Sequence, residues 1–249
     1  MNYEADRILN TYLLFHYGTR EEILAGSSLE GIGAASFSDA CFRFPVATVT
    51  DTFDLEKGPF SRALDLGCAV GRSSFELSKV AGEVIGIDFS QSFIEAAARL
   101  GMDQTLRYRR YSESHLGDDL FASVPADSIP ERIRFQVGDA MNLPSDLGSF
   151  DLVHAANLLC RLSEPLRLLK RLPDLVKPGG QLVLATPATW LEEFTPTEYQ
   201  PEGLTLDYLE TQLSSDFDRQ TVTELPFLIR DHQRKFQIST SQASLWIRR

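Results

Sequence analysis

The chain is poor in cysteine and has no long apolar run. Its three cysteines, Cys41, Cys68 and Cys160, lie far apart and form no CxxC pair. This spacing indicates neither a disulfide framework nor a zinc site, and no cluster of His, Cys and Asp suggests another metal. No apolar run approaches the ~18 residues of a membrane span, and the charged N-terminus lacks the apolar core of a signal peptide. We therefore expect a cytoplasmic protein without membrane contact or bound metal.

Basic residues are also in deficit. The sequence holds 24 Lys and Arg against 35 Asp and Glu, a formal net charge of −11. Nucleic-acid binding needs a clustered basic face, and the nearest candidate is LRYRRY, with Arg107, Arg109 and Arg110. Three arginines make a small patch, which is more typical of a solvated or lid-like loop. A small-molecule substrate is the better expectation.

The 249 residues are enough for one α/β domain, which we divide into two parts. Residues 1–60 predict a helical cap. Its first helix lies in NYEADRILNTYLLFHYG, with Asn2 as N-cap and Gly18 at the C′ position. One or two further helices then cross to the sheet. Residues 61–249 predict the core.

Strand and helix patterns alternate from residue 62. Buried strands are predicted in RALDLG, EVIGIDFS, ERIRFQVGDA, FDLVHAANLL and QLVLATP, and a helix ending in a Pro-Gly-Gly turn precedes the last of them. This alternation predicts a parallel sheet with helices on both faces. ELPFLIRD and ASLWIRR, joined by HQRKF, are two further strands. Residues 101–130 and 187–203 are long connections, which are typical of lids or binding loops.

Polar residues or glycines follow each of the first four strands. The first strand gives Asp65 and the turn from Gly67 to Gly71, and the second gives Asp88. The third and fourth give Asp139 and Asn157. Ligands of open α/β sheets bind beyond this edge, where a carboxylate can accept hydrogen bonds from ribose hydroxyls. The four positions together indicate a nucleoside-type ligand.

The glycine spacing distinguishes between cofactors. A dinucleotide turn has the pattern G-x-G-x-x-G, whereas GCAVG has the shorter G-x-x-x-G. This disfavours the rival reading, a nicotinamide-dependent oxidoreductase. ALDLGCAVGR resembles the first motif of class I S-adenosylmethionine-dependent methyltransferases, and IGIDFS, VGDA, FDLVHAANLL and LVKPGGQLVLATP resemble later segments of that family. Where the family has a middle glycine this chain has Ala69, which predicts a negative φ there.

The resemblance covers roughly residues 60–190. It implies a Rossmann-like fold with a mostly parallel seven-stranded sheet and an antiparallel edge strand, and S-adenosylmethionine as cofactor. The cofactor-site residues that it implies are Asp65, Gly67, Cys68, Gly71, Asp88, Phe89, Ser90, Asp139, Ala140 and Asn157. Cys68 has no histidine beside it in the sequence, so we expect it to pack rather than react.

A narrower resemblance extends over nearly the whole chain. YEADRILNTYLLFHYG, LDLGCAVGRSSFELS, TWLEEFTP and RKFQIS…ASLWIRR resemble the 4-mercaptohistidine N-methyltransferases of ovothiol biosynthesis. In that family the domain is often fused behind a sulfoxide synthase, which makes the thiol-histidine precursor. The resemblance implies methylation of an imidazole ring, with a sulfoxide synthase as functional partner. The sulfur compound, its selenium analogue and other imidazoles all remain open as substrates.

Candidate acceptor-site residues lie outside the glycine turn. They are Phe15, His16, Tyr17, Arg72, Arg161, Trp190 and Glu193. Of these, Glu193, His16 and Tyr17 are candidates to accept a proton from the ring. The arginines could hold a carboxylate bidentately.

Each of these candidates has a structural alternative. Aromatic residues at a helix end often form core, and surface arginines often form salt bridges. His154, inside a central strand, is expected to pack, and His115 and His232 have no assigned role. A different small-molecule acceptor, or a noncatalytic S-adenosylmethionine-binding partner of a synthase, is the alternative function.

Overall fold

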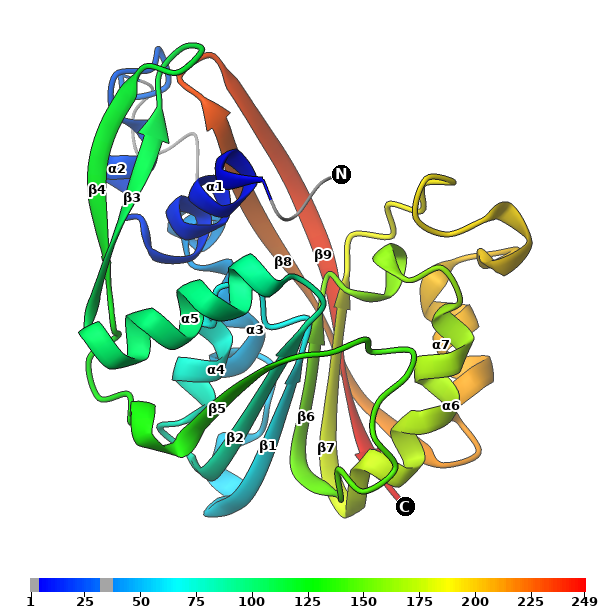
Figure 1. Cartoon of the computed structure of the whole chain (residues 1–249). Coiled ribbons are helices and arrows are strands. Elements are labelled where there is room, and N and C mark those ends of the chain that lie inside the picture. The colour runs from blue at the N-terminus through cyan, green and yellow to red at the C-terminus, as the bar shows by residue number, and fades with distance from the viewer. Residues whose placement is uncertain (1–4, 32–37) are drawn as a thin grey trace.

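A seven-stranded sheet forms the centre of the molecule (Figure 1). The computed structural model describes residues 5–31 and 38–249. The strands are β1 (Phe60–Leu66), β2 (Ala81–Asp88), β5 (Ile133–Val137), β6 (Phe150–Ala156), β7 (Val176–Thr186), β8 (Phe217–His232) and β9 (Lys235–Arg248). Their order is β5-β2-β1-β6-β7-β9-β8, and the first five run parallel. The antiparallel pairing expected at one edge is made by β9, which lies between β7 and β8. The predicted Rossmann-like fold is confirmed.

Helices cover both faces of the sheet. In Figure 1, α3 (Phe44–Thr50), α4 (Arg72–Leu77) and α5 (Gln91–Asp103) lie on one side, and α6 (Pro165–Leu175) and α7 (Thr205–Leu213) lie on the other. Residues of β1 alternate between these layers. Leu64 and Leu66 pack in the cluster that includes α6 and α7, whereas Ala63 packs with Val49 and Leu77 on the α3–α4 side. Because helices cover both faces of β1, consecutive residues from Ala63 to Leu66 are buried.

The N-terminal cap begins with α1 (Asp6–Tyr17), followed by α2 (Arg20–Leu24). The predicted N-cap, Asn2, lies outside the described residues, and Ala5 precedes the helix without a side-chain cap. Gly18 ends α1, but its φ of −65° is extended rather than left-handed, so the C′ prediction is wrong in conformation. Space explains the glycine: a Cβ atom here would lie 2.6 Å from the Leu14 carbonyl oxygen.

Residues 101–130, expected as a lid loop, contain a hairpin. The strands β3 (Thr105–Tyr111) and β4 (Gly117–Ser123) pair antiparallel, and a single 3-10 turn (Pro130–Arg132) precedes β5. Leu106 and Tyr108 face inward and are buried, while Arg107 and Arg109 face outward and pair with Asp119 across the hairpin. Arg110 pairs with Asp118. The expected solvated loop is therefore a strand whose positive charge is locally neutralised.

The strands β8 and β9 are much longer than the two segments predicted from sequence. Their far ends extend beyond the sheet to the cap and to the β3–β4 hairpin (Figure 1). Arg230 of β8 donates hydrogen bonds to the carbonyl oxygens of Ile23 and Ala25 in the cap. Arg234, in the turn after β8, pairs with Glu113 of the hairpin loop at 2.8 Å. Three segments distant in sequence thus form one lobe over the carboxyl ends of the strands.

Two connections near the end of the core can also be compared with their predictions. The Pro-Gly-Gly segment predicted as a turn after α6 already belongs to β7, beside a register shift in its pairing with β6. Residues 187–203 remain a loop apart from a 3-10 turn at Thr197–Tyr199. Its role as a lid stays a prediction.

Candidate functional site

A cavity of about 370 Å³ opens at the carboxyl ends of β1, β2, β5 and β6, beneath the cap. The sheet edge and the cap both contribute to its wall. From the sheet edge come Gly67, Cys68, Ala69, Asp88, Phe89, Ser90, Asp139, Ala140 and Asn157, and from the cap come Tyr12, Phe15, His16 and Phe44. Eight of the ten predicted cofactor-site residues thus line one cavity, and their contact with a cofactor stays a prediction.

The glycine turn between β1 and α4 is left-handed at three positions. Gly67 has φ +69° and Gly71 has φ +86°. A Cβ atom on Gly71 would lie 2.8 Å from the Phe135 ring, so Gly71 serves close packing and does not line the cavity. Ala69 has φ +47°, and the predicted negative φ is wrong. This conformation costs an alanine about 1–2 kcal/mol, which the rest of the turn offsets.

Asp88, at the end of β2, is fixed by backbone donors. Its Oδ2 accepts a hydrogen bond from Ala69 N at 2.8 Å, and its Oδ1 accepts one from Ser90 N at 2.9 Å. A carboxylate oxygen accepts more than one hydrogen bond, so these bonds orient Asp88 without preventing contact with ribose hydroxyls. Beside it, the ring of Phe89 is 78% exposed and offers an aromatic face at the cavity.

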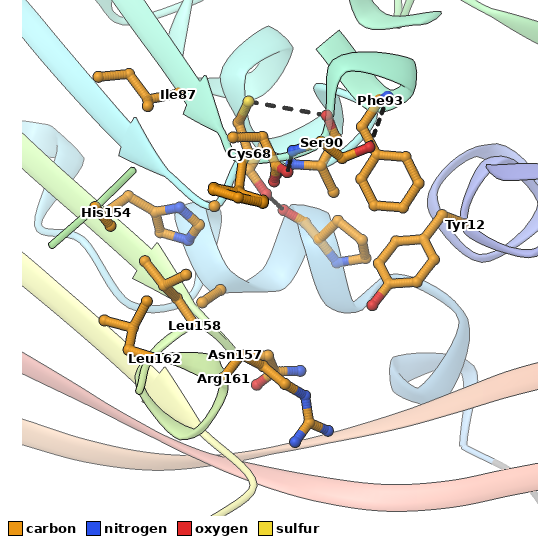
Figure 2. Close-up of a pocket in the computed structure, with 18 of the residues that line it drawn as sticks. Tyr12, Cys68, Ile87, Ser90, Phe93, His154, Asn157, Leu158, Arg161 and Leu162 are labelled. Carbon is orange, nitrogen blue, oxygen red and sulfur yellow. Dashed lines mark hydrogen bonds between the residues drawn. The ribbon is translucent and has the colours of Figure 1, made fainter. Parts of the chain in front are cut away.

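The next two strand ends supply further polar groups. Asp139 Oδ1 accepts a hydrogen bond from Met141 N at 2.8 Å, which holds the turn after β5. Asn157, after β6, adopts φ +55°, and its Oδ1 accepts a hydrogen bond from Ser241 Oγ of β9 at 2.6 Å. Figure 2 shows Asn157 beside Arg161 at one side of the pocket.

The structure does not place Asp65 in the cavity wall. Its carboxylate is 1% exposed, accepts a hydrogen bond from Ser74 Oγ at 2.6 Å, and lies 2.8 Å from His154 Nδ1. Asp65 faces inward because β1 residues alternate between the two helical layers. His154, expected only to pack, does line the cavity. The signal that could have revealed it is register, since Asp65 and His154 are paired neighbours on β1 and β6.

The aromatic end of α1 divides between cavity and core. Phe15 and His16 line the cavity. Burial lowers the pKa of His16 to about 3, with Asp65 opposing and Arg72 adding to this effect, so the imidazole is neutral at neutral pH. Tyr17 lies outside the wall and donates a hydrogen bond to the Val70 carbonyl oxygen at 2.7 Å. Burial raises the Tyr17 pKa well above its usual value, so Tyr17 is not placed to accept a proton.

Two further acceptor-site candidates are engaged elsewhere. Arg72 pairs with Glu76 at 2.9 Å, and Trp190 Nε1 donates to Thr205 Oγ1 at 2.9 Å. Acceptor contact by either residue stays a prediction, and neither lines the cavity. In each case another residue of the fold already binds the polar group of the side chain.

Arg161 and Glu193 do line the cavity. The Arg161 guanidinium lies 4.7 Å from the centre of the Phe194 ring and donates to the Thr189 carbonyl oxygen. No carboxylate in the described part of the chain forms an ion pair with it. Cys68 is buried in the wall, and burial, with Asp65 and Asp88 nearby, raises its pKa well above the usual value. A thiol in that state packs rather than attacks.

Residues 5–31 and 38–249 contain no group of three or more His, Cys, Asp and Glu placed to hold a metal ion. The same residues form no helix with the length and apolar character needed to cross a bilayer.

The cavity fits S-adenosylmethionine in its donor set. Asp88 has a carboxylate that could accept hydrogen bonds from ribose hydroxyls, the exposed Phe89 could pack against adenine, and the left-handed turn would let a ligand approach the backbone closely. A family model described as a methyltransferase domain matches residues 64–184, from β1 through β7. This segment is therefore similar to methyltransferase domains, and the solved structure of a methyltransferase with the same fold contains S-adenosylhomocysteine, which supports S-adenosylmethionine as the cofactor.

Particular relatives agree with this class. Demethylmenaquinone methyltransferase of Staphylococcus epidermidis is 32% identical over 138 residues, which cover 54% of this chain and 46% of that protein. The ubiquinone biosynthesis O-methyltransferase of Coxiella burnetii is 29% identical over 123 residues, 49% of this chain and 42% of the relative. The matched segment thus spans less than half of the length of these curated relatives.

One solved structure is similar over nearly its entire length. The N-methyltransferase NodS of Bradyrhizobium japonicum, in complex with S-adenosylhomocysteine, covers 96% of this chain and 98% of its own, with a TM-score of 0.53 and 15% identity. At that identity the likeness establishes the fold alone. The acceptor has to be inferred from the residues of this chain.

Proposed function

We propose that this protein is a cytoplasmic S-adenosylmethionine-dependent N-methyltransferase that methylates the imidazole ring of a thiol-histidine, or of its selenium analogue. One observation carries the proposal: beneath the cap, aromatic walls, a neutral imidazole and a guanidinium meet in the cavity that begins at the glycine turn. A planar, electron-rich ring with an anionic amino-acid end matches those walls chemically.

The aromatic side of the cavity suits a flat acceptor. Phe15 and Phe44 stack with ring centres 6.0 Å apart, and Tyr12 lies against Phe93 with centres 4.8 Å apart. Figure 2 shows Tyr12 and Phe93 side by side at the edge of the pocket. These packed rings hold their orientation without a ligand, so an imidazole can bind between fixed surfaces and away from water.

Two charged groups at the cavity can recognise the ends of the acceptor. Arg161 can donate two hydrogen bonds to a carboxylate, and its partners among the described residues are carbonyl oxygens and the Phe194 ring. Glu193 is exposed at the solvent side of the wall. The Glu193 carboxylate can accept a hydrogen bond from the amino group of the acceptor, or it can take up a proton from the acceptor ring.

Two of the predicted proton acceptors lie in the wall, and a proton released by the ring would go to Glu193. His16 has a buried Nδ1 without a hydrogen-bond partner among the described residues, but its pKa of about 3 disfavours uptake of a full proton, so its role would be to accept a hydrogen bond. When bound, S-adenosylmethionine supplies the activated methyl group, so the chain itself has to orient the ring, exclude water and hold a proton. A thiolate on the ring adds electron density and makes a strong base unnecessary.

The precursor thiol-histidine requires a separate enzyme. We infer that a sulfoxide synthase supplies it, because the resemblance to ovothiol enzymes extends to YEADRILNTYLLFHYG and TWLEEFTP, outside the shared cofactor core. No further partner is needed for the methyl transfer.

The test is incubation with S-adenosylmethionine and 4-mercaptohistidine or its selenium analogue, followed by mass spectrometry of the products. Ring-methylated product from either compound supports the proposal. In parallel, calorimetry should detect S-adenosylmethionine binding at about micromolar Kd or tighter, with a raised Tm by mass action, and no binding of NAD. Cofactor binding without any product would favour a noncatalytic S-adenosylmethionine-binding module.

A further inference from the structure

Beneath the glycine turn, three polar side chains form a buried row across two strands and a helix. Asp65 of β1 lies beside His154 of β6, and Ser74 of α4 lies behind it. Asp65 and His154 are each 1% exposed, and Ser74 is fully buried. A row of this kind is costly to bury unless every member is satisfied.

The row determines which nitrogen of His154 carries a proton. His154 Nδ1 lies 2.8 Å from the Asp65 carboxylate, which can only accept a hydrogen bond when ionised, so we assign the ring proton to Nδ1. The lone pair therefore resides on Nε2, which is buried and has no hydrogen-bond partner among the described residues. His154 lines the cavity, and Figure 2 shows its imidazole projecting from β6 toward the interior of the pocket.

A second imidazole nitrogen is also buried without a hydrogen-bond partner. His16 Nδ1, from the cap, is also buried in the wall of this cavity without a partner in the described part of the chain. The other buried atoms without partners belong to residues outside the cavity wall. Both unpartnered ring nitrogens therefore belong to residues that line the same cavity.

The charge behind His154 selects the kind of ligand. Asp65 has no lysine or arginine within ion-pair distance in the described ranges, and its two side-chain donors are His154 and Ser74. A buried carboxylate supported only by these groups favours a cation nearby and repels an anion. An ammonium group provides both the positive charge and an N–H for the Nε2 lone pair.

We propose that His154 is a ligand-binding residue whose Nε2 accepts a hydrogen bond from the α-ammonium group of an amino-acid moiety. Asp65 is a positioning residue that fixes the tautomer and supplies the countercharge. Two ligands of this site carry such a group: the methionine portion of the cofactor and an amino-acid acceptor. The second source rests on the function proposed above, and the first does not.

The experiment compares ligands that differ in this group. S-adenosylhomocysteine has the α-ammonium and 5′-methylthioadenosine lacks it, and calorimetry gives both affinities. His154→Phe removes the lone pair. Asp65→Asn presents an amide donor to Nδ1 and so moves the ring proton to Nε2. If the cofactor is the source, both variants should lower S-adenosylhomocysteine affinity about 10- to 100-fold and leave methylthioadenosine within about twofold.

The acceptor arm uses the same variants saturated with S-adenosylhomocysteine. If the acceptor is the source, 4-mercaptohistidine loses about 10-fold or more in affinity, while the same thiol-imidazole with a propionate chain and no amino group is unaffected. The exposed His115→Gln serves as control and should change none of these values. Thermal melting verifies that each variant is folded.

A readout on the unmodified protein keeps the proposal testable if the variants do not fold. Nitrogen NMR of labelled histidines should show His154 Nε2 unprotonated in the free protein and shifted on addition of S-adenosylhomocysteine or acceptor. A protonated Nε2 in the free protein, or equal losses for ligands with and without the amino group, overturns the proposal. Normal amino-group discrimination without methylated product overturns the proposed function alone.

Discussion

The two sides of the cavity are built in different ways. On the sheet edge, Asp88 is held by the backbone N–H groups of Ala69 and Ser90, both in turns that begin at a strand end. Under the cap, Phe15, Phe44 and Phe227 meet from α1, α3 and β8, with ring centres 4.8 to 6.0 Å apart. The first side depends on local backbone geometry, and the second on packing between distant segments. Cofactor and acceptor binding should therefore be separable by mutation.

The largest expected effect is on the sheet-edge side. Asp88→Ala should weaken S-adenosylmethionine binding about 100-fold, because it removes charge-assisted hydrogen bonds to ribose worth about 1.5–3 kcal/mol each. Folding should survive, since Asp88 faces a cavity rather than the core. Calorimetric titration measures the loss, with the exposed Asp146→Ala as control. Wild-type affinity in Asp88→Ala would show that Asp88 does not bind the cofactor.

On the cap side, burial of His16 predicts a pH-dependent stability. The pKa of about 3 in the folded protein lies below the ordinary 6.5, so the unfolded chain binds the extra proton between these values. The contribution of the neutral His16 ring to the free energy of unfolding is therefore present above pH 6.5 and is lost as the pH falls. From pH 7 to 5 this loss should reach up to about 2 kcal/mol.

His16→Phe should remove that part of the pH dependence. Urea unfolding of the ligand-free protein at pH 7 and pH 5 measures it, and His115→Gln should keep the wild-type dependence. Equal acid sensitivity in wild type and His16→Phe would show that His16 is not buried in its neutral form.

Glu193, in the 187–203 loop, tests directly whether cofactor and acceptor binding can be separated. Glu193→Gln should lower kcat/KM for the acceptor about 10-fold through loss of a charged contact, while cofactor affinity stays within about twofold. Glu192→Gln changes the neighbouring exposed carboxylate, outside the cavity wall, and should have no effect. A parallel fall in cofactor affinity would show that the two sides are not independent.

The smallest expected effect concerns the left-handed alanine. Ala69→Gly should stabilise the protein by about 0.5–1 kcal/mol, because glycine adopts φ +47° without the Cβ penalty. Denaturant unfolding measures it. The helical Ala97→Gly, a matched control in α5, should destabilise by about 1 kcal/mol or more. Destabilisation in both variants would mean that the Ala69 methyl contributes more by packing than its conformation costs.

The difference between the two sides also explains what the sequence could predict. Strand order and the positions of Gly67, Asp88 and Asn157 follow from short contiguous motifs, so the sheet and its edge were predictable. The direction in which a side chain points could not be predicted. Asp65 faces α4 and His154 because of strand alternation, and Trp190 bonds to Thr205 across a helix start. Such contacts join residues of different elements, and no short motif contains both partners.

The β3–β4 hairpin was missed for a related reason. LRYRRY alternates apolar and basic residues, a strand pattern, but its charge suggested a solvated segment. The compensating acids, Asp118 and Asp119, come only after the turn. Pairing across the hairpin, not the composition of either strand, makes it stable.

The proposed activity depends most on recognition of the acceptor's thiol at the cap side of the cavity. The direct measurement is competition between 4-mercaptohistidine and histidine for limiting enzyme, with products quantified by mass spectrometry. We predict that kcat/KM for 4-mercaptohistidine exceeds that for histidine by at least ~100-fold, which corresponds to about 2.7 kcal/mol of transition-state discrimination. The reason is that the protein group that binds the thiolate has no partner when histidine occupies the site. Equal rates for the two acceptors would contradict thiol recognition while leaving the methyltransferase fold intact.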